Sequence, residues 1–442
     1  MKKSLLALAA MGAFASVAQA QSSVTVYGVL DEGYVGGNVR SSNGTVATTG
    51  VTNATTTDGK TGVVKKTGGG FAAGAESTNR IGVRGSEDLG GGLSAFFTYE
   101  AKMDIDGGSG TATTSDSGLF STTRQAFVGL KKNGIGSLAF GTQNTVIYEA
   151  VLATDPTGTN NIAGSLLSMR TTGAAGGAAY QTGLGADSAY ETRLKNTLTL
   201  KTDNFAGFTA RAIILASSAN TTQTQSATAG VSGVGGQANN TGFGLGVDYA
   251  WKNLFLTANM QNFKASSNGI AQTTAPVIFG ATAAGAGGSV NAFGSNVQDN
   301  GQYYAATYDF GMLKAYANYI NRKMSMDTNT SYFSKLTAQQ IGVRSFITPT
   351  IEGWIAGSVG KYSSLPQIVS TGAGAAYTPG QANLTAMQVG ANYFLSKRTN
   401  LYAIYGQQGS SNVAFAATGS SVPGNTTSAN VNNYAVGVRH TF

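Results

Sequence analysis

The chain has 442 residues, of which 62 are glycine, 6 are proline and none is cysteine, and its formal net charge is +8. No tract rich in lysine and arginine occurs, which argues against nucleic-acid binding. The proline and cysteine contents disfavour a collagen-like chain, a proline-rich disordered chain and a disulfide-rich scaffold. Only 11% of the residues are charged, whereas a soluble surface usually has about 25% or more.

The N-terminus has the features of a bacterial signal peptide. Lys2 and Lys3 precede an apolar run from Leu5 to about Val17, and Ala18-Gln19-Ala20 has the small-x-small pattern of a signal-peptidase site. The run is shorter than the roughly 20 residues that a membrane-spanning helix needs. We expect cleavage after Ala20, which removes two lysines and lowers the formal charge from +8 to +6.

Residues 21–442 are predicted to form one domain built from β-strands. Apolar and polar residues alternate in segments of about ten residues, and no apolar run is long enough for a spanning helix. Short Gly/Asn/Asp turns and long Ser/Thr/Gly/Ala loops separate these segments in alternation. This rhythm predicts an all-β, transmembrane antiparallel barrel with short periplasmic turns and long extracellular loops.

The expected elements follow in chain order. Short turns are expected at 88–92, 132–136, 203–207, 251–253, 309–311, 348–353 and 396–398. The pattern predicts about sixteen strands, which start near Ser23, Asn79, Leu93, Ser121, Gly136, Arg193, Phe208, Thr241, Leu254, Gln302, Met312, Lys335, Gly353, Leu384, Thr399 and Val431. Barrels of about 16–18 strands enclose an aqueous channel, and counts of 14 or 18 also fit this pattern.

Most strands alternate cleanly, with one face suited to lipid and the other to water. Two segments, Met312–Arg322 and Gly353–Tyr362, are apolar on both faces in places. They either contribute to a subunit interface or have boundaries that are wrong by several residues.

The long loops are polar and low in charge. They are expected at Asn38–Thr78, Ser217–Asn240, Ala265–Gly301 and Gln407–Asn430. Their composition also fits disordered linkers. Disordered linkers would not be expected only between every second pair of strands. We therefore interpret these segments as the loops at one end of the barrel.

The last residues form an amphipathic strand that ends on an aromatic residue. Tyr434, Val436, Val438, His440 and Phe442 share the face expected to contact lipid. This segment resembles the final strand of outer-membrane barrels, whose terminal aromatic residue is read by the barrel-assembly machinery. Phe442, Val438, Val436 and Tyr434 are therefore the expected assembly signal.

Further segments resemble the general, non-specific porins of Gram-negative β-proteobacteria. The matching segments are Gln21–Asp31, Arg80–Gly90, Arg124–Leu130 and Gly136–Gly141, and the resemblance covers essentially the whole chain. It implies a sixteen-stranded barrel in the outer membrane, three barrels side by side and one pore in each barrel. The expected partners are outer-membrane lipid and lipopolysaccharide, two further copies of the chain, and small hydrophilic solutes and anions; no cofactor is expected.

The resemblance also implies that the third long loop, from about Gln143 to Glu191, folds into the lumen and forms the constriction. Glu149 and Asp155 are the candidate acids on this loop, which also contains Asp187 and a single basic residue, Arg170. Four apolar or aromatic side chains are available to attach the loop to the wall: Tyr148, Leu152, Leu166 and Leu167.

Such porins oppose an acidic loop with basic residues on the wall. Arg80 and Arg84 lie on the face opposite Ile81 and Val83, and Arg124 falls at the family's wall-arginine position. Four other basic residues are inward by parity: Lys102, Arg193, Lys195 and Arg211. An excess of positive charge at a constriction lowers the barrier for anions. Each of these residues has the alternative of a structural role, such as neutralising a nearby carboxylate or facing bulk water.

Other functions have less support in the sequence. The one histidine, His440, lies near the chain end, and no Gly-x-Ser-x-Gly motif sits between a strand and a helix, so a hydrolase is disfavoured. One histidine and no cysteine exclude a His/Cys metal site. A sugar- or phosphate-specific channel is the main alternative, although Tyr303, Tyr316 and Tyr402 show no spacing typical of an aromatic track. An adhesin role for exposed loops is a third alternative.

Overall fold

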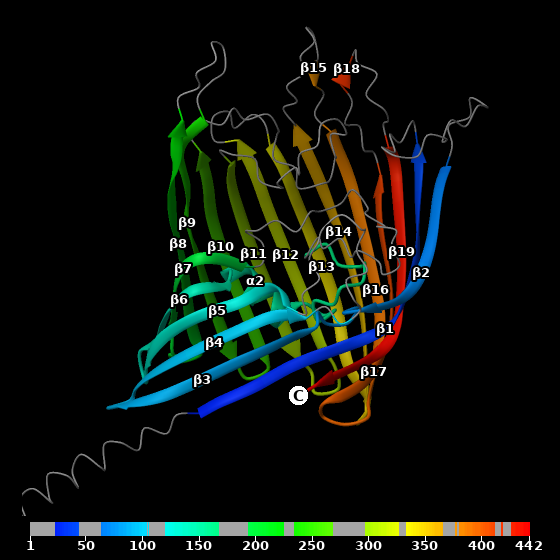
Figure 1. The fold of residues 1–442 in the computed structure, drawn as a ribbon. Coiled ribbons are helices and arrows are strands. Elements are labelled where there is room, and N and C mark those ends of the chain that lie inside the picture. Colours follow the sequence, from blue (N-terminus) through cyan, green and yellow to red (C-terminus); the bar gives the residue numbers. More distant parts are fainter. Residues whose placement is uncertain are drawn as a thin grey trace, which may run out of the picture.

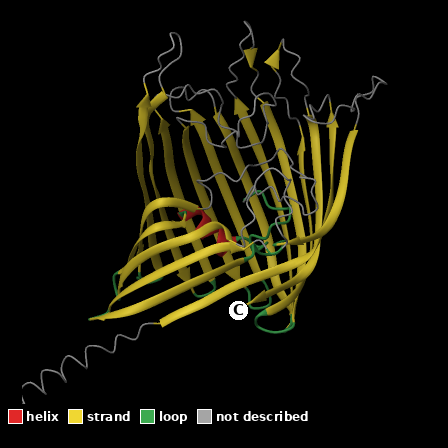
Figure 2. Cartoon of the chain, in the orientation of Figure 1, coloured by secondary structure: helices red, strands yellow, loops and turns green. Residues whose placement is uncertain are grey.

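The computed structural model describes residues 23–43, 63–103, 105, 120–167, 193–224, 234–267, 297–326, 333–365, 376–377, 380–411, 417–418 and 426–442. This part of the chain forms an antiparallel barrel with one helix inside it (Figures 1 and 2). No helix among the described residues is long and apolar enough to cross a membrane.

The barrel wall is built from the following strands: β1 (Ser23–Asn43), β2 (Val63–Ala73), β3 (Arg80–Gly90), β4 (Leu93–Met103), β5 (Phe120–Lys132), β6 (Gly136–Asn144), β7 (Arg193–Thr202), β8 (Phe208–Thr224), β9 (Val234–Trp251), β10 (Leu254–Ser267), β11 (Val297–Asp309), β12 (Lys314–Met326), β13 (Phe333–Thr348), β14 (Ile351–Leu365), β16 (Gly380–Phe394), β17 (Thr399–Ser411) and β19 (Thr426–Thr441). Two short strands, β15 (Ala376–Tyr377) and β18 (Ala417–Thr418), pair with each other.

The seventeen wall segments make sixteen barrel strands. Strand β2 pairs with residues 32–42 of β1, and β3 pairs with residues 23–29 of the same strand. These two segments therefore form one barrel strand that is interrupted between Gly74 and Asn79. On its other side β1 pairs with β19, from Val29 opposite Thr441 to Asn43 opposite Thr426, which closes the barrel.

The predicted short turns are confirmed, and the long loops are shorter than expected. All seven turns connect strands at one end of the barrel (Figure 1). The expectation of a loop over Asn38–Thr78 was wrong, because β1 continues to Asn43 and β2 occupies Val63–Ala73. Strands also extend into the other three expected loops, for example to Thr224 in β8 and from Val297 in β11.

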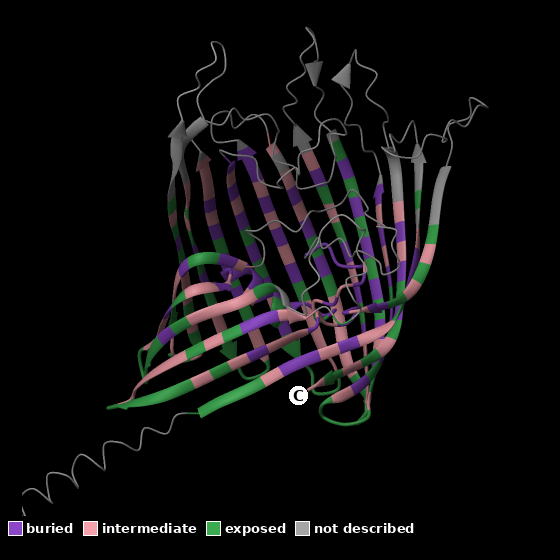
Figure 3. Cartoon of the chain, in the orientation of Figure 1, coloured by how far each residue is buried: buried purple, intermediate pink, exposed green. Residues whose placement is uncertain are grey.

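Large apolar side chains cover the outer face, as the alternation predicted. In β9, Phe243, Leu245 and Val247 are exposed, and in β16 Met387 and Val389 are exposed. Exposed and buried residues alternate along these strands in Figure 3. Exposed apolar residues on every second position suit a wall in contact with lipid chains.

The interior contains an apolar core on only one side of the barrel. Helix α2 (Val146–Thr154) and the segment after it cover the inner wall of β8–β17, where buried Ile213, Phe263, Met324 and Leu384 pack together. This packing explains the two segments that are apolar on both faces. Inward-facing Ile320 belongs to this apolar core, and inward-facing Trp354 is buried in a second apolar cluster with Ile162, a residue of the interior segment.

Candidate channel constriction

The interior segment begins with a well-capped helix. The Thr145 hydroxyl accepts a hydrogen bond from the backbone N–H of Tyr148 (3.2 Å), and Glu149 lies in the first turn, where a negative charge stabilises a helix. The helix buries Val146, Ile147, Ala150 and Val151 against the wall. This apolar face holds the helix inside the barrel.

Glycines in the wall leave space for the helix. A methyl group at Gly244 would lie 2.8 Å from Cγ2 of Val146, and one at Gly301 would lie 2.9 Å from Cδ1 of Ile147. Because glycine has no Cβ, the helix can approach the strand backbone closely at both positions. The helix end is fixed by polar contacts, since Thr154 Oγ1 lies 2.6 Å from the Tyr303 hydroxyl and the Asn318 side chain donates to the Thr154 carbonyl oxygen (2.9 Å).

Asp155 anchors the segment that follows the helix. The residue is 4% exposed, and its carboxylate accepts hydrogen bonds from the Gln340 side chain (2.9 Å) and from the backbone and hydroxyl of Thr157 (3.0 and 2.7 Å). Its charge therefore faces the wall. Burial favours complete hydrogen bonding of such a group. The role of Asp155 as an acid of the constriction stays a prediction.

Gln388 holds the next part of the segment. This fully buried side chain exchanges two hydrogen bonds with the Asn160 side chain (2.6 and 3.0 Å) and donates to the carbonyl oxygens of Ile162 (3.1 Å) and Ala163 (3.0 Å). The Trp354 indole N–H also donates to Gln388 Oε1 (3.0 Å). One inward side chain of β16 thus binds three residues of the segment.

The middle of the segment is attached to the interruption between β2 and β3. The Asn161 N–H donates to the Ala75 carbonyl oxygen (2.9 Å), and its side chain donates to the Gly74 carbonyl oxygen (2.6 Å). Buried Asp31 supports this junction, because its carboxylate accepts from the Glu76 N–H (2.7 Å) and the Tyr402 hydroxyl (2.7 Å). Residues 146–161 therefore follow the inner wall from β8 to this interruption, and the segment then turns back, since the Ser165 hydroxyl donates to Gln340 Oε1 on β13 (2.8 Å).

The sequence identified most of the apolar anchors of this segment. Tyr148, Leu166 and Leu167 are buried, with at most 5% exposure, as expected of residues that attach the loop to the wall. Leu152 is 43% exposed, so the same expectation was wrong for it, because it lies on the opposite face of α2. Arg170, Asp187 and Glu191 lie outside the described residues.

Arginine side chains gather on the wall that the segment leaves uncovered. Arg80 and Arg124 share the carboxylate of Glu100, with Nε–Oε distances of 3.8 Å and 2.6 Å. The Glu100 side chain is 7% exposed, whereas those of Arg80 and Arg124 are 26% and 13% exposed. Arg80 also lies within electrostatic range of Tyr148 on the helix. The two arginines therefore approach the interior segment from the wall.

A β-bulge places Arg124 in this cluster. The pairing of β4 with β5 shifts after Glu100, which faces Gln125, whereas the next residue, Ala101, faces Thr123. Arg124 is the extra residue, so simple alternation could not assign its direction.

Arg84 extends the cluster toward the short-turn end. It is exposed, and its guanidinium lies 5.3 Å from the ring centroid of Tyr27 on β1. The Tyr27 hydroxyl donates to Glu100 (3.2 Å), so the ring connects Arg84 to the cluster. Lys102 pairs with Arg80 across β3 and β4 and shares its face. Arg80, Arg84, Arg124 and Glu100, here called the basic cluster, have a formal charge of +2.

Three other basic residues were predicted to face the lumen, and the structure places them in different surroundings. Arg211 faces inward, but its Nη2 lies 2.6 Å from Asp248 Oδ1, which neutralises it. The guanidinium of Arg193 lies 5.2 Å from the Tyr148 ring centroid. The parity argument was wrong for Lys195, which is exposed while its neighbour Leu194 is buried in the apolar core.

The reversal at Lys195 has a local cause. Asn196 has a positive φ of 56°, and the pairing of β6 with β7 shifts between Gly141 and Gln143. This irregularity inserts a residue and exchanges the two faces of β7 above Thr197.

Several carboxylates that pair with inward arginines were not among the predicted site residues. Besides Glu100, Asp299 lies 2.5 Å from Arg322, Glu352 lies 2.7 Å from Arg344, and Glu76 lies 3.2 Å from Arg439. Strand register could have identified some of them, since Asp299 is two rows from Arg322 on the same inward face. Among the described residues no group of three histidine, cysteine or acidic residues could hold a metal ion.

The C-terminal strand has the orientation expected of it. Tyr434, Val436, Val438 and Phe442 are 41–51% exposed on the outer face, whereas Ala435 is fully buried. The N–H of Phe442 donates to the Gly28 carbonyl oxygen (3.1 Å), and the Gly28 N–H donates back (3.0 Å). The terminal residue is therefore part of the seam that closes the barrel.

A closed β-barrel whose interior is narrowed by an inserted segment defines a transmembrane channel protein. The model of the Gram-negative porin family matches residues 7–414, and the chain belongs to this family of outer-membrane porins. It is 32% identical over 213 residues to an outer membrane porin protein of Bordetella pertussis, which covers 47% of this chain and 46% of that one. The chain thus spans about half the length of the curated relatives it matches.

Solved structures share the fold along nearly the whole chain. An anion-selective porin from Comamonas acidovorans matches with a TM-score of 0.60 and 19% identity, over 95% of this chain and 100% of that one. A trimer form of OmpT, an outer membrane protein of Vibrio cholerae, matches with a TM-score of 0.55 and 14% identity, over 95% and 99% of the two chains. At these identities the likeness concerns the fold alone.

Proposed function

We propose that the protein is a passive-diffusion channel for small hydrophilic solutes and ions, with a preference for anions. The observation that carries this proposal is the basic cluster on the wall, in which Arg80 and Arg124 share Glu100 and Arg84 lies over the ring of Tyr27, whose hydroxyl donates to the same carboxylate. Permeating ions would pass between this wall and the segment. Positive charge that exceeds negative charge at a narrow point lowers the energy of anions there.

The two described acids of the interior segment are both held by neutral hydrogen-bond donors. Asp155 is turned to the wall, and Glu149 is half-buried and accepts a hydrogen bond from the Asn144 side chain. The low-dielectric wall around a water-filled path focuses the field of the arginines. The name of the matched anion-selective porin agrees with this reading, and it describes that protein.

A channel dedicated to sugars receives less support from the geometry. Tyr303 and Tyr402 are 0% and 3% exposed, and their hydroxyls are bonded to Thr154 and Asp31. Buried tyrosines cannot form a track along which a sugar ring slides. We also propose that three copies of the chain assemble into a trimer. We propose no catalytic activity for it.

Liposome swelling is the direct test of passive diffusion. Vesicles that contain the purified protein should swell in solutions of small neutral sugars at rates that fall steeply with solute size. In planar bilayers the same preparation should give stepwise increases of conductance. Vesicles that swell no faster than protein-free vesicles, together with the lack of conductance steps, would reject the channel function.

A further inference from the structure

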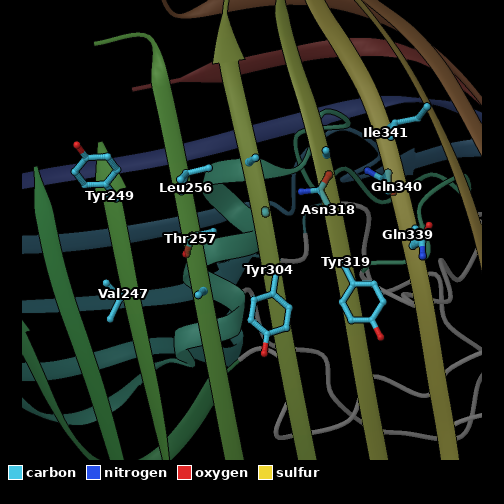
Figure 4. A pocket seen from close by; sticks show the side chains of 14 residues that line it. Val247, Tyr249, Leu256, Thr257, Tyr304, Asn318, Tyr319, Gln339, Gln340 and Ile341 are labelled. Carbon is cyan, nitrogen blue, oxygen red and sulfur yellow. The ribbon is translucent and has the colours of Figure 1, made fainter. Parts of the chain in front are cut away.

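An open groove of about 630 Å³ lies on the outer face of β9–β13 (Figure 4). Its floor is made of small side chains, since Ala306 pairs with Ala317 across β11 and β12 and Ala258 lies beside them. Leu256, Ile341, Tyr304 and Tyr319 form its sides. The outer face around it carries larger residues, so the alanines create a depression in a lipid-facing wall.

The two tyrosines form one edge of the groove. Their rings are paired, with centroids 6.2 Å apart, and in Figure 4 their hydroxyl groups point toward the long-loop end of the strands. Gln339 lies beside Tyr319 in the same row and is exposed. The groove is therefore apolar on one side and polar on the side that faces the long loops.

A polar row follows one step closer to the long loops. The strand register aligns Gln302, Asn321 and Thr337 on the outer face. The Asn321 side chain donates to Gln302 Oε1 (3.3 Å), and the Thr337 hydroxyl donates to Asn321 Oδ1 (3.5 Å). Amides and a hydroxyl at this depth suit the ester and hydroxyl groups of a lipid rather than its chains.

Three lysines lie in this row and in the next one toward the long loops. Lys361 on β14 continues the polar row opposite Thr337, and Lys323 lies directly opposite Lys335 one step closer to the long loops. Like charges that face each other across strands are destabilising unless an anion lies between them. The Lys323 ammonium lies 5.1 Å from the Phe333 ring centroid, and no acidic residue among the described ones forms an ion pair with Lys335 or Lys361.

The sequence around these lysines adds little negative charge. Residues 268–296 and 366–379 contain no charged residue, and residues 327–332 contain one acid, Asp327. Asp327 is therefore the one acidic residue in these three stretches of sequence. We call Lys323, Lys335 and Lys361 the lysine triad.

The spacing of the rows fits the depth of one membrane leaflet. Six residues separate Lys335 from Ile341, which corresponds to about 20 Å along a strand. A strand tilt of about 40° reduces this to a depth of about 15 Å. That depth is half of a hydrocarbon core of about 30 Å, so chains that begin at the lysine triad would end in the groove.

From these rows we infer that the outer face of β10–β14 binds an anionic membrane lipid of the outer leaflet. Its phosphate lies at the lysine triad, its ester and hydroxyl groups lie along the row of Gln302, Asn321 and Thr337, and an acyl chain fills the alanine-floored groove. The site is separate from the channel, because all these side chains are on the outside of the wall. It does not depend on ion selectivity.

Native mass spectrometry of the detergent-purified full chain, with added bisphosphorylated lipid A as the probe, tests this site. The triple variant K323Q/K335Q/K361Q should bind the lipid at least tenfold more weakly than wild type. The groove variant A306F/A317F, which keeps all charges, should also bind more weakly. The control K132Q/K252Q/K397Q removes three lysines from the short-turn end and should bind like wild type.

Two further probes distinguish a lipid phosphate from free inorganic phosphate as the bound group. Lipid A without phosphates should bind at least tenfold more weakly than the bisphosphorylated form, and inorganic phosphate should not displace the lipid at equal concentration. Equal loss in the triad variant and its control, equal binding of dephosphorylated lipid, or displacement by inorganic phosphate would overturn the inference. So would a change of subunit number in the groove variant, which would show that a second copy covers the groove. Lys335→Gln alone replaces the triple variant if the latter does not fold.

Discussion

The Nε atom of Arg124 lies 2.6 Å from Oε1 of Glu100, and the same carboxylate faces Arg80 at 3.8 Å. Three neighbouring arginines thus have one acid among them, counting Arg84 behind the Tyr27 ring. Glu100 is therefore the one carboxylate that offsets the positive charge of the basic cluster.

Glu100→Gln should increase anion preference. The change adds one net positive charge, and a unit charge about 10 Å from a permeating ion in water is worth about 0.4 kcal/mol. It favours an anion and disfavours a cation by this amount, so the anion-to-cation permeability ratio should change roughly fourfold. Glutamine keeps an acceptor for Arg124, so the fold should persist. Bi-ionic measurements in planar bilayers give the ratio. Glu87→Gln, at the exposed end of β3, is the control; an equal shift in both variants would refute the special position of Glu100.

The pair of Arg211 and Asp248 should contribute little to selectivity as a unit. Its two charges are 2.6 Å apart and cancel at the distance of a permeating ion. The double variant R211Q/D248N should therefore keep the wild-type permeability ratio. Arg211→Gln alone leaves the Asp248 charge without its cationic partner and should shift the permeability ratio roughly fourfold toward cations. If the double variant shifts as far as the single one, the two residues do not act as a neutral pair.

Gly406→Ala should displace the interior segment. A methyl group at Gly406 would overlap the carbonyl oxygen of Ala163, whereas one at Gly357 on β14 would meet no atom within 4 Å. Overpacking of this kind costs about 1–3 kcal/mol. We expect altered single-channel conductance and greater open-channel noise in G406A, with wild-type behaviour in the matched variant G357A. Identical traces from the two variants would show that the segment is not fixed at β17.

Phe442→Ala should lower the amount of protein in the outer membrane. The side chain is 41% exposed on the outer face, so its loss removes the predicted assembly signal without opening a cavity in the core. Immunoblots of outer-membrane fractions measure the yield, and refolding of the purified variant in detergent measures its intrinsic folding. A fall in both quantities would indicate a structural role at the Gly28 seam instead of recognition by the assembly machinery.

The sequence predicted the wall of the barrel because lipid and water impose a period of two on every strand. Phe243 to Val247 and Tyr434 to Val438 show this pattern plainly, and the seven short turns separate the strands. The pattern fails where strands are rich in glycine or polar residues. Strand β2, with three consecutive glycines at 68–70, has the composition of a loop and is held by its pairing with β1.

The sequence predicted several residues of the candidate site, but it did not predict the contacts that those residues make. Arg80 and Arg84 follow from alternation, but Arg124 and Lys195 depend on local irregularities in pairing that sequence parity does not reveal. The anchoring role of Asp155 depends on Gln340, a residue 185 positions away. Long-range hydrogen bonds of this kind decide whether an acid faces water or the wall, and alternation contains no information about them.

The reversal potential of single channels in a KCl gradient tests the account most directly. If the basic cluster sets selectivity, the wild-type protein gives a reversal potential with the sign of anion permeation, and R80Q/R84Q/R124Q moves it clearly toward that of an unselective pore. A wild-type potential with the sign of cation permeation, or a triple variant with an unchanged potential, would contradict it.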